Sequence, residues 1–419
     1  MPLIDRAVKG ASGSRAAVLA PCQDAGQFQT GAVILLSIMH WVHDTYTAFL
    51  PPLLPLLIAN LSLSVTEAGL LSVFMQGPSL LQPVIGHLAD RVSLRYFVIL
   101  APAVTAAMMS LVGIAPNYAV LALFLVIVGL SSAAMHAVGP VLVGNQAGRR
   151  LGRGMGFWMV GGELGRTLGP IVIVSAVAVL TLPGTPWLMI GGLLVSLVLY
   201  VRFKDLPERR PAPGPGQAVW SALGRMGPLL IPLAGLLLAR SFMSAALTTY
   251  LPVFLSAEGA DFWLAGVSLT VLEAAGVGGA LLGGALSDRL GRRIVLFISM
   301  TTTPVFMLVF LLVSGWAQWP LLLAMGFTLL AVTPVMMALV QESFPENRAL
   351  ANGAYMALSF IIQSVGVVAW GALGDMFGLR SAFVFSAVVP LLSLPFLLWL
   401  PGRRRPDGAG PGRVRESLI

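Results

Sequence analysis

The sequence has very little charge. Only 10 % of its 419 residues are Asp, Glu, Lys or Arg, whereas 57 % are hydrophobic, and the mean hydropathy is +0.89. A soluble domain carries about 25 % charged residues. The composition therefore excludes a soluble globular protein and predicts one that crosses a membrane many times. The apolar residues form long unbroken runs, which favours helices over a β-barrel with its alternating strands of about ten residues.

Cysteine and histidine are also scarce. The single cysteine, Cys22, excludes an internal disulfide and any cysteine-built zinc or iron–sulfur site. Four histidines are scattered along the sequence, so we predict no metal and no cofactor. No metal-ligand cluster and no nucleophile–base pair has a recognisable spacing, which argues against an intramembrane enzyme.

Twelve apolar runs have lengths near the roughly 20 residues that a helix needs to cross a bilayer. They cover residues 31–59, 64–89, 94–113, 117–143, 153–180, 184–203, 227–255, 261–286, 293–314, 318–341, 347–373 and 379–400. The predicted organisation is a tail (1–30), a six-helix bundle (31–203), a linker (204–226), a second six-helix bundle (227–401) and a basic tail (402–419).

The basic residues are distributed unevenly between the two sides of this topology. With both termini on one side, 22 of the 25 Lys and Arg residues lie in the tails and loops of that side. The positive-inside rule then places both termini in the cytoplasm, and we predict a multi-pass protein of the cell (inner) membrane. The same placement accounts for the net charge of +8, so the charge does not indicate nucleic-acid binding. Membrane lipid is the expected contact of the basic tail.

A short charged motif occurs twice, 198 residues apart, each time between two apolar runs. Such a repeat indicates a duplicated unit, and its position predicts a tight hairpin between two membrane helices. The motif resembles the signature loop of the major facilitator superfamily, G-x-x-x-D-R-x-G-R-R, which gates the cytoplasmic side. The second copy matches at every fixed position, whereas the first has Ser93 and Leu94 in place of Gly and Arg. The candidate gating residues are Gly86, Asp90, Arg91 and Arg95, and Gly284, Asp288, Arg289, Gly291, Arg292 and Arg293.

The first span carries an acid, Asp44, near mid-membrane. A charge at that depth needs a partner, a proton or a water-filled cavity. His40 lies one turn away on the same helical face, whereas His43 is expected to point elsewhere. Asp44 is either a proton carrier or a buried hydrogen-bonding group, and the prolines that follow it should let the span bend.

The fifth span resembles the G-x8-G-x3-G-P motif of the superfamily's proton-coupled exporters through Gly156, Gly165, Gly169 and Pro170. Small residues at this spacing let another helix approach closely. Ordinary helix packing would explain the same glycines without any role in transport. Glu163 and Arg166 stand at i and i+3 within the motif, as a structural or a functional ion pair. His136 in the fourth span either titrates or makes a structural hydrogen bond.

The second half repeats the first and adds two mid-depth charges. Arg240 lies at the depth of Asp44, and Glu273 lies in the eighth span. Either residue could serve transport, or the two could pair structurally, with each other or with charges of the other half. Together, His40, Asp44, His136 and the glycine-rich fifth span resemble the fosmidomycin-resistance family of exporters, although Glu163 stands where that family usually has Asn.

The resemblance implies an all-α integral membrane fold of the major-facilitator type, with twelve helices in two pseudo-symmetric six-helix bundles. Spans 1, 4, 7 and 10 would line a central cavity, and spans 5 and 8 would meet across the halves. The predicted function is proton-coupled antiport that exports a small anionic or amphiphilic molecule, by a monomer whose partners are substrate, protons and lipid. The expected proton carriers are Asp44, Glu163, Glu273 and His136, and the expected substrate-binding residues are His40, Asp44, His136, Arg166 and Arg240. A proton-coupled importer of an organic anion and a non-transporting sensor of the same fold remain alternatives.

Overall fold

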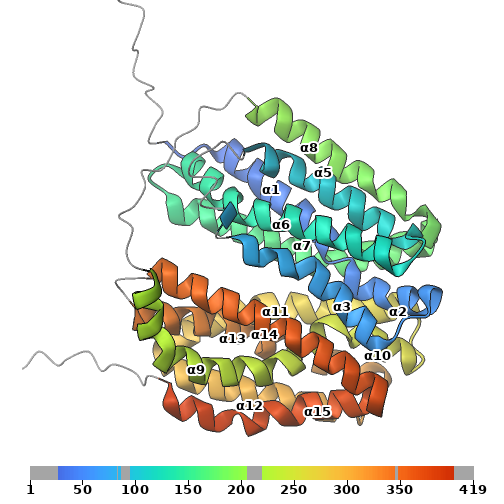
Figure 1. Ribbon diagram of the computed structural model, residues 1–419, viewed down its shortest axis with the longest axis vertical. Helices are drawn as coiled ribbons and strands as arrows, with labels where there is room; N and C mark the ends of the chain where they lie inside the picture. Colours follow the sequence, from blue (N-terminus) through green and yellow to red (C-terminus); the bar gives the residue numbers. More distant parts are fainter. Residues whose placement is uncertain (1–26, 83, 86–94, 205–218, 345–347, 401–419) are drawn as a thin grey trace, which may run out of the picture.

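The computed structural model describes residues 27–82, 84–85, 95–204, 219–344 and 348–400 (Figure 1). All regular elements in these ranges are helices, as the long apolar runs predict, because a helix satisfies its own backbone hydrogen bonds inside a bilayer. The first half contains α1 (Thr30–Thr47), α2 (Leu50–Leu61), α3 (Val65–Gln76), η1 (Gly77–Leu81), α5 (Arg95–Leu111), η2 (Val112–Ile114), α6 (Tyr118–Ala147), α7 (Leu151–Leu180), η3 (Leu182–Leu188) and α8 (Met189–Phe203).

The second half repeats this arrangement of helices. It contains α9 (Val219–Ser244), η4 (Ala245–Thr249), α10 (Leu251–Ala257), α11 (Phe262–Leu290), α12 (Arg292–Phe310), η5 (Gly315–Ala317), α13 (Gln318–Ser343), α14 (Arg348–Phe377), α15 (Leu379–Leu392) and η7 (Leu394–Trp399). Within the described ranges, ten helical segments are long and apolar enough to cross a membrane. They correspond to predicted spans 3 to 12, while α1 with α2 and α3 with η1 occupy the first two predicted spans.

The first span of each half is broken at the same place. In the first half, α1 ends at Thr47 and α2 begins at Leu50 with Pro51 in its first turn. In the second half, α9 passes into the π-helical turn η4, and α10 begins at Leu251 with Pro252 in its first turn. Proline lacks a backbone N–H and favours the start of a helix, so each Leu-Pro pair restarts the helix. The predicted bend beyond Asp44 is confirmed.

Two boundaries differ from the predictions. Helix α9 begins at Val219, inside the segment predicted as linker 204–226, so the second bundle starts before residue 227. The second charged hairpin is tighter than expected, because α11 continues through Asp288 to Leu290 and α12 begins at Arg292. The turn is made by Gly291 alone, at a φ of 101° that favours glycine. Gly284, expected to permit the turn, instead lies within α11.

The two halves lie side by side and are joined on one side of the molecule (Figure 1). There, one apolar core runs continuously from Leu50, Leu53 and Leu54 of α2 to residues of α9, α10 and α14. Asp375 of α14 accepts hydrogen bonds from the backbone N–H groups of Val65 (2.8 Å) and Thr66 (2.9 Å) in α3. The side where α2 meets α10 is therefore closed across the halves.

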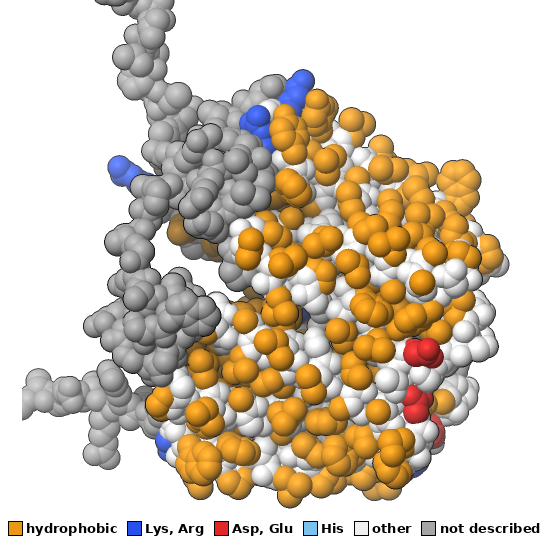
Figure 2. Space-filling model, in the orientation of Figure 1, with side chains coloured by type: hydrophobic (Ala, Val, Ile, Leu, Met, Phe, Trp, Pro, Cys, Tyr) orange, Lys and Arg blue, Asp and Glu red, His pale blue; other side chains and the backbone are white. Residues whose placement is uncertain are grey.

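The described residues of the two halves separate toward the opposite side (Figure 2). Figure 2 shows a hollow between the halves on the side where α8 ends and α9 begins, and hydrophobic side chains covering the flanks that Figure 2 displays. On that side the first half has a separate apolar core around Val33, Leu36 and Met39. Within the described ranges, the two halves therefore meet on one side of the molecule and leave a hollow between them on the other.

Candidate functional site

Glycines of α7 bring α7 and α1 into backbone contact. Gly161, Gly165 and Gly169 stand one turn apart, and a Cβ at each would overlap a carbonyl oxygen of α1, that of Ser37, Trp41 and Thr45 respectively. The prediction that small residues of the fifth span admit another helix is confirmed for Gly165 and Gly169. It is wrong for Gly156, because a Cβ there would meet nothing within 4 Å. Pro170 is buried inside α7.

This contact places a buried polar cluster between α1, α6 and α7. His40 Nε2 lies 3.2 Å from Asp44 Oδ2, and His136 Nε2 of α6 lies 3.8 Å from Asp44 Oδ1. The side chains of His40 and Asp44 are 5 % and 9 % exposed, whereas that of His136 is 33 % exposed. Sequence reasoning paired His40 with Asp44 correctly, and the fold adds His136 from another helix.

Backbone carbonyls fix the tautomers of both histidines. His40 Nδ1 lies 2.9 Å from the carbonyl oxygen of Trp158, and His136 Nδ1 lies 2.9 Å from that of Ser132. A carbonyl oxygen only accepts, so both Nδ1 atoms carry hydrogen and donate. Each Nε2 that faces Asp44 is therefore an acceptor unless a further proton is bound. Two unprotonated acceptors facing an ionised carboxylate repel it, and a proton bound between them would remove that repulsion.

Three further residues adjoin this cluster, of which Trp158 and Gly162 had no role predicted from the sequence. Trp158 stacks on the ring of His40 at a centroid distance of 4.0 Å. Gly162 leaves room for the cluster, since a Cβ there would lie 2.6 Å from His40 Cε1 and 3.1 Å from Asp44 Oδ2. His43 was expected to point elsewhere, yet its fully buried ring lies 6.0 Å from that of His136. Trp158 and Gly162 look like ordinary residues of a glycine-rich helix in the sequence. Their contacts with the cluster depend on the position of α1 beside α7.

Histidines that are scattered in the sequence are thus gathered in the fold. The ligand atoms of His40, Asp44 and His136 all lie within 4.8 Å of one another, close enough for a small cation to bridge them. The scattered positions of the histidines in the sequence are therefore no reason to expect that a metal site is absent. The prediction of no resident metal stays a prediction.

The predicted charge pair of α7 is formed. Arg166 Nη2 lies 2.6 Å from Glu163 Oε2, and the side chain of Arg166 is 47 % exposed. Glu273 of α11 also interacts electrostatically with Arg166. The predicted meeting of spans 5 and 8 is confirmed, since Thr270 Oγ1 of α11 accepts a hydrogen bond from the backbone N–H of Ile171 in α7 (3.1 Å). Arg166 therefore forms an ion pair with an acid of its own half and lies within electrostatic range of an acid of the other half.

Arg240 does not pair with Glu273, contrary to one of the predicted alternatives. Its Nη2 donates to Thr333 Oγ1 (3.1 Å) and to the carbonyl oxygen of Leu329 (3.4 Å), both on α13. No ion pair links Arg240 to a carboxylate within the described ranges. The position of Arg240 at the depth of Asp44 was predicted, but its partners were not.

The second gating motif forms an ion-pair chain within its own half. Arg292 Nη2 lies 2.6 Å from Asp288 Oδ1 and 2.6 Å from Glu342 Oε1 at the end of α13. Arg289 is exposed, and Arg293 has a buried Nε without a hydrogen-bond partner. In the first motif, Arg95 lies over the ring of Tyr96, while Gly86, Asp90 and Arg91 lie outside the described residues.

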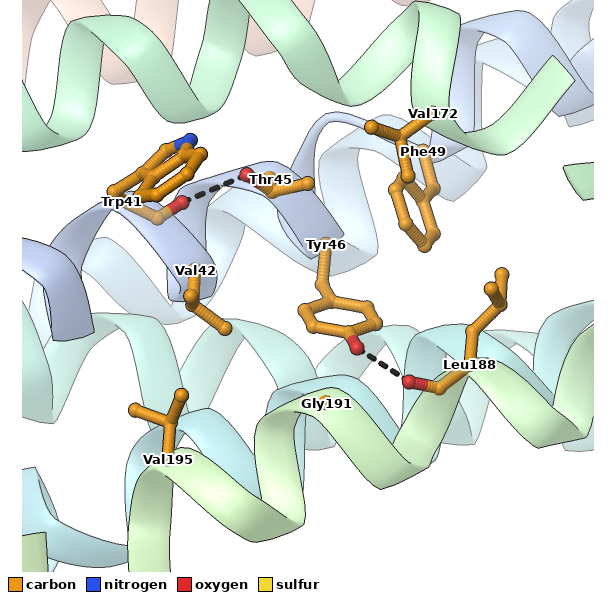
Figure 3. A pocket seen from close by; sticks show the side chains of 9 residues that line it. All are labelled: Trp41, Val42, Thr45, Tyr46, Phe49, Val172, Leu188, Gly191 and Val195. Carbon is orange, nitrogen blue, oxygen red and sulfur yellow. Dashed lines mark hydrogen bonds between the residues drawn. The ribbon is translucent and has the colours of Figure 1, made fainter. Parts of the chain in front are cut away.

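A partly open groove of about 310 Å³ lies on another face of α1 (Figure 3). Its lining is almost entirely apolar and is contributed by α1, α7, η3 and α8: Trp41, Val42, Thr45, Tyr46, Phe49, Val172, Leu188, Gly191 and Val195. Two of its hydroxyls are already satisfied, since Thr45 donates to the Trp41 carbonyl and Tyr46 to that of Leu188. This groove contains none of the candidate site residues and is separate from the charged cluster.

Two helical halves around a one-sided hollow, with charged residues in mid-span, define a multi-pass membrane transporter. The family model described as Major Facilitator Superfamily matches residues 36–322 and 266–417. The chain therefore belongs to the Major Facilitator Superfamily, as the repeated motif predicted.

Full-length relatives share this assignment. The Fosmidomycin resistance protein of Escherichia coli (strain K12) is 24 % identical over 383 residues, which cover 90 % of this chain and 94 % of that protein. The Uncharacterized MFS-type transporter YfnC of Bacillus subtilis (strain 168) is 25 % identical over 380 residues, covering 87 % and 92 %. The predicted resemblance to the fosmidomycin-resistance family is confirmed.

Solved structures of low sequence identity share the fold. A bacterial homologue of the human lysosomal transporter Spinster, in an inward-facing and occupied conformation, aligns with a TM-score of 0.75 at 15 % identity, covering 88 % of this chain and 96 % of that chain. A D-xylose-proton symporter aligns with a TM-score of 0.70 at 14 % identity, covering 90 % and 98 %. The likeness at this identity concerns the fold alone.

Proposed function

We propose that this transporter is a proton-coupled antiporter that exports a small anionic or amphiphilic molecule by alternating access. The observation that carries the proposal is the arrangement of His40, Asp44 and His136, in which two imidazole acceptors face one carboxylate. A proton bound there relieves the repulsion, and its loss restores it. Asp44 is the proposed first proton carrier, with His136 as the member reached from the hollow, because its side chain is 33 % exposed.

The position of the cluster supports coupling between protonation and helix packing. His40 and Asp44 contact Gly162 of α7, so a change in their spacing acts directly on the close contact between α1 and α7. Nine residues further along, α7 contacts α11 of the second half through Ile171 and Thr270. A helix in contact with both the proton site and the opposite half can transmit a change from one to the other.

A second group of charges supports the same mechanism. Arg166 interacts with Glu163 and Glu273, and an arginine keeps its proton in proteins. One acid can neutralise Arg166 while the other takes up a proton. Because Glu273 belongs to the second half, protonation of Glu273 would leave Arg166 paired with Glu163 alone and weaken the contact between the halves.

The proposed orientation makes the described state open to the cytoplasm. If the positive-inside rule holds, the hollow between the end of α8 and the start of α9 faces inward. Export then requires substrate to enter from the cytoplasm and proton binding from the outside to drive the return. The relative named for fosmidomycin resistance supports export of a drug-like molecule.

The test uses everted membrane vesicles from an efflux-deficient bacterial host that expresses the full chain. An acid interior is generated by respiration and followed with a fluorescent ΔpH dye, while compounds from a drug panel that includes phosphonate antibiotics are added. An exported substrate should dissipate the gradient in wild-type vesicles. Asp44→Asn should abolish the response, and Glu258→Gln should retain it, because Glu258 pairs only with Arg380 at the rim.

Two results would reject the proposal. The first is a full response by Asp44→Asn at normal expression, which removes Asp44 from coupling. The second is a gradient that dissipates only when vesicles are preloaded with the compound, which is the behaviour of a symporter. Binding of a compound without any flux would favour the sensor alternative.

A further inference from the structure

Three arginines of the described helices form ion pairs with carboxylates, whereas Arg240 forms none there. Arg166, Arg292 and Arg380 each lie within 3.2 Å of a carboxylate oxygen. Among the described residues, Arg240 hydrogen-bonds only to the neutral oxygens of Thr333 and Leu329, and its buried Nε has no hydrogen-bond partner there. A charge at mid-span without a counter-charge is costly, and an anion bound beside Arg240 would lower that cost.

The guanidinium faces the interior of the protein. Ile231 and Leu238 form the outward stripe of α9, with 69 % and 45 % of their surface exposed. Arg240 lies nine residues after Ile231 and two after Leu238, which places it on the opposite side of the helix at 100° per residue. Its partner Thr333 comes from α13, and Tyr355 of α14 lies near enough to interact electrostatically with it.

We propose that Arg240, Thr333 and Tyr355 form an oxyanion subsite that takes the carboxylate, sulfonate or phosphonate group of an organic ligand. Nε and the free Nη hydrogens of arginine match two oxygens of such a group in a fork geometry. The hydroxyls of Thr333 and Tyr355 supply neutral donors beside it. The subsite lies wholly in the second half, whereas the cluster of His40, Asp44 and His136 lies wholly in the first.

This separation gives the two bundles different tasks. The first half, with Asp44, would bind protons, and the second half would bind the anionic group of the substrate. We assign the anion to Arg240 rather than to Arg166, because a carboxylate oxygen of Glu163 already lies 2.6 Å from Arg166 Nη2. The inference that the bound anion is the transported substrate rests on the proposed transport function. The inference that Arg240 binds an anion does not depend on it.

The test measures equilibrium binding to the purified full chain in lipid nanodiscs by calorimetry. The probes are benzoate, benzenesulfonate and phenylphosphonate, with benzamide as the neutral probe of matched shape. Arg240→Gln should weaken binding of at least one of the three anions about ten- to a hundredfold and leave benzamide unchanged, as loss of a charged hydrogen-bond pair predicts. The control is Arg380→Gln, which removes an arginine at the rim and should leave all four affinities unchanged.

Two further variants protect the test against misfolding. Arg240→Lys keeps the charge but not the fork and should recover only part of the anion affinity. Thr333→Val removes one hydroxyl and should weaken anions by a smaller factor without affecting benzamide. Anion binding that is equal in Arg240→Gln and wild type, or a wild type that does not prefer the anions to benzamide, overturns the subsite.

The outcome is separable from that of the transport proposal. Arg240-dependent anion binding without flux in vesicles would leave the subsite standing and reject antiport. Normal flux in vesicles together with unchanged anion binding in Arg240→Gln would reject the subsite and leave antiport standing.

Discussion

Asp375 should hold the closed side of the transporter shut. Its carboxylate accepts from the N–H groups of Val65 and Thr66 at 2.8 and 2.9 Å and from Thr66 Oγ1 at 2.5 Å. These are orphan donors at the start of α3, where the helix dipole also favours a negative charge. The acid comes from α14 of the other half, so the cap exists only while the halves are closed on this side.

Neighbouring contacts place Asp375 within a larger closed interface. The Tyr250 hydroxyl lies 3.1 Å from the Val65 carbonyl oxygen and 3.0 Å from that of Val367, and its ring stacks on Trp370 at 4.0 Å. Each hydrogen bond to a charged group contributes about 1.5–3 kcal/mol when buried, and less at an exposed rim. Because Asn retains one acceptor oxygen, Asp375→Asn should destabilise the closed side by about 1–2 kcal/mol, or roughly tenfold in population.

The assay is labelling of an introduced cysteine on the closed side. Cys22 is the only native cysteine, so Cys22→Ser gives a cysteine-free background. Ala68→Cys reports opening, because Ala68 is fully buried in α3. Asp375→Asn should raise its rate of labelling by a membrane-impermeant maleimide about tenfold. The matched control is Asp261→Asn, because Asp261 caps α11 within its own half at 2.9 Å. An unchanged rate in Asp375→Asn, or an equal rise in Asp261→Asn, would refute the reasoning.

Two further predictions concern the charged interior. Gly162→Ala should abolish proton-coupled transport because its Cβ would lie 2.6 Å from the His40 ring, whereas Gly156→Ala, with no neighbour within 4 Å, should transport normally in the same vesicle assay. Arg166→Ala should lower expression and transport by leaving Glu163 and Glu273 unpaired, and adding Glu273→Gln should restore part of the expression. Strictly additive losses, measured as membrane protein yield for the two single variants and the double variant, would show that Arg166 and Glu273 act independently.

The sequence by itself determined the architecture. Low charge and long apolar runs define the spans, because the bilayer admits few other structures for such runs. The local sequence also determined where the first span of each half is interrupted, since Pro51 and Pro252 restart a helix at equivalent places in the two halves. The pairing of His40 with Asp44 and of Glu163 with Arg166 followed from helical spacing alone.

Tertiary structure alone decided which side chains meet across helices. Residue counting gives the depth of Arg240 and Glu273 in the membrane but not the direction in which each faces, so their pairing was a reasonable expectation that the fold does not realise. Arg240 instead contacts Thr333, 93 residues away, and Asp375 contacts Thr66, 309 residues away. Gly162 and Trp158 gain their roles only because α1 lies against α7. Sequence periodicity specifies one helix at a time, whereas a site between helices depends on how each is rotated against its neighbours.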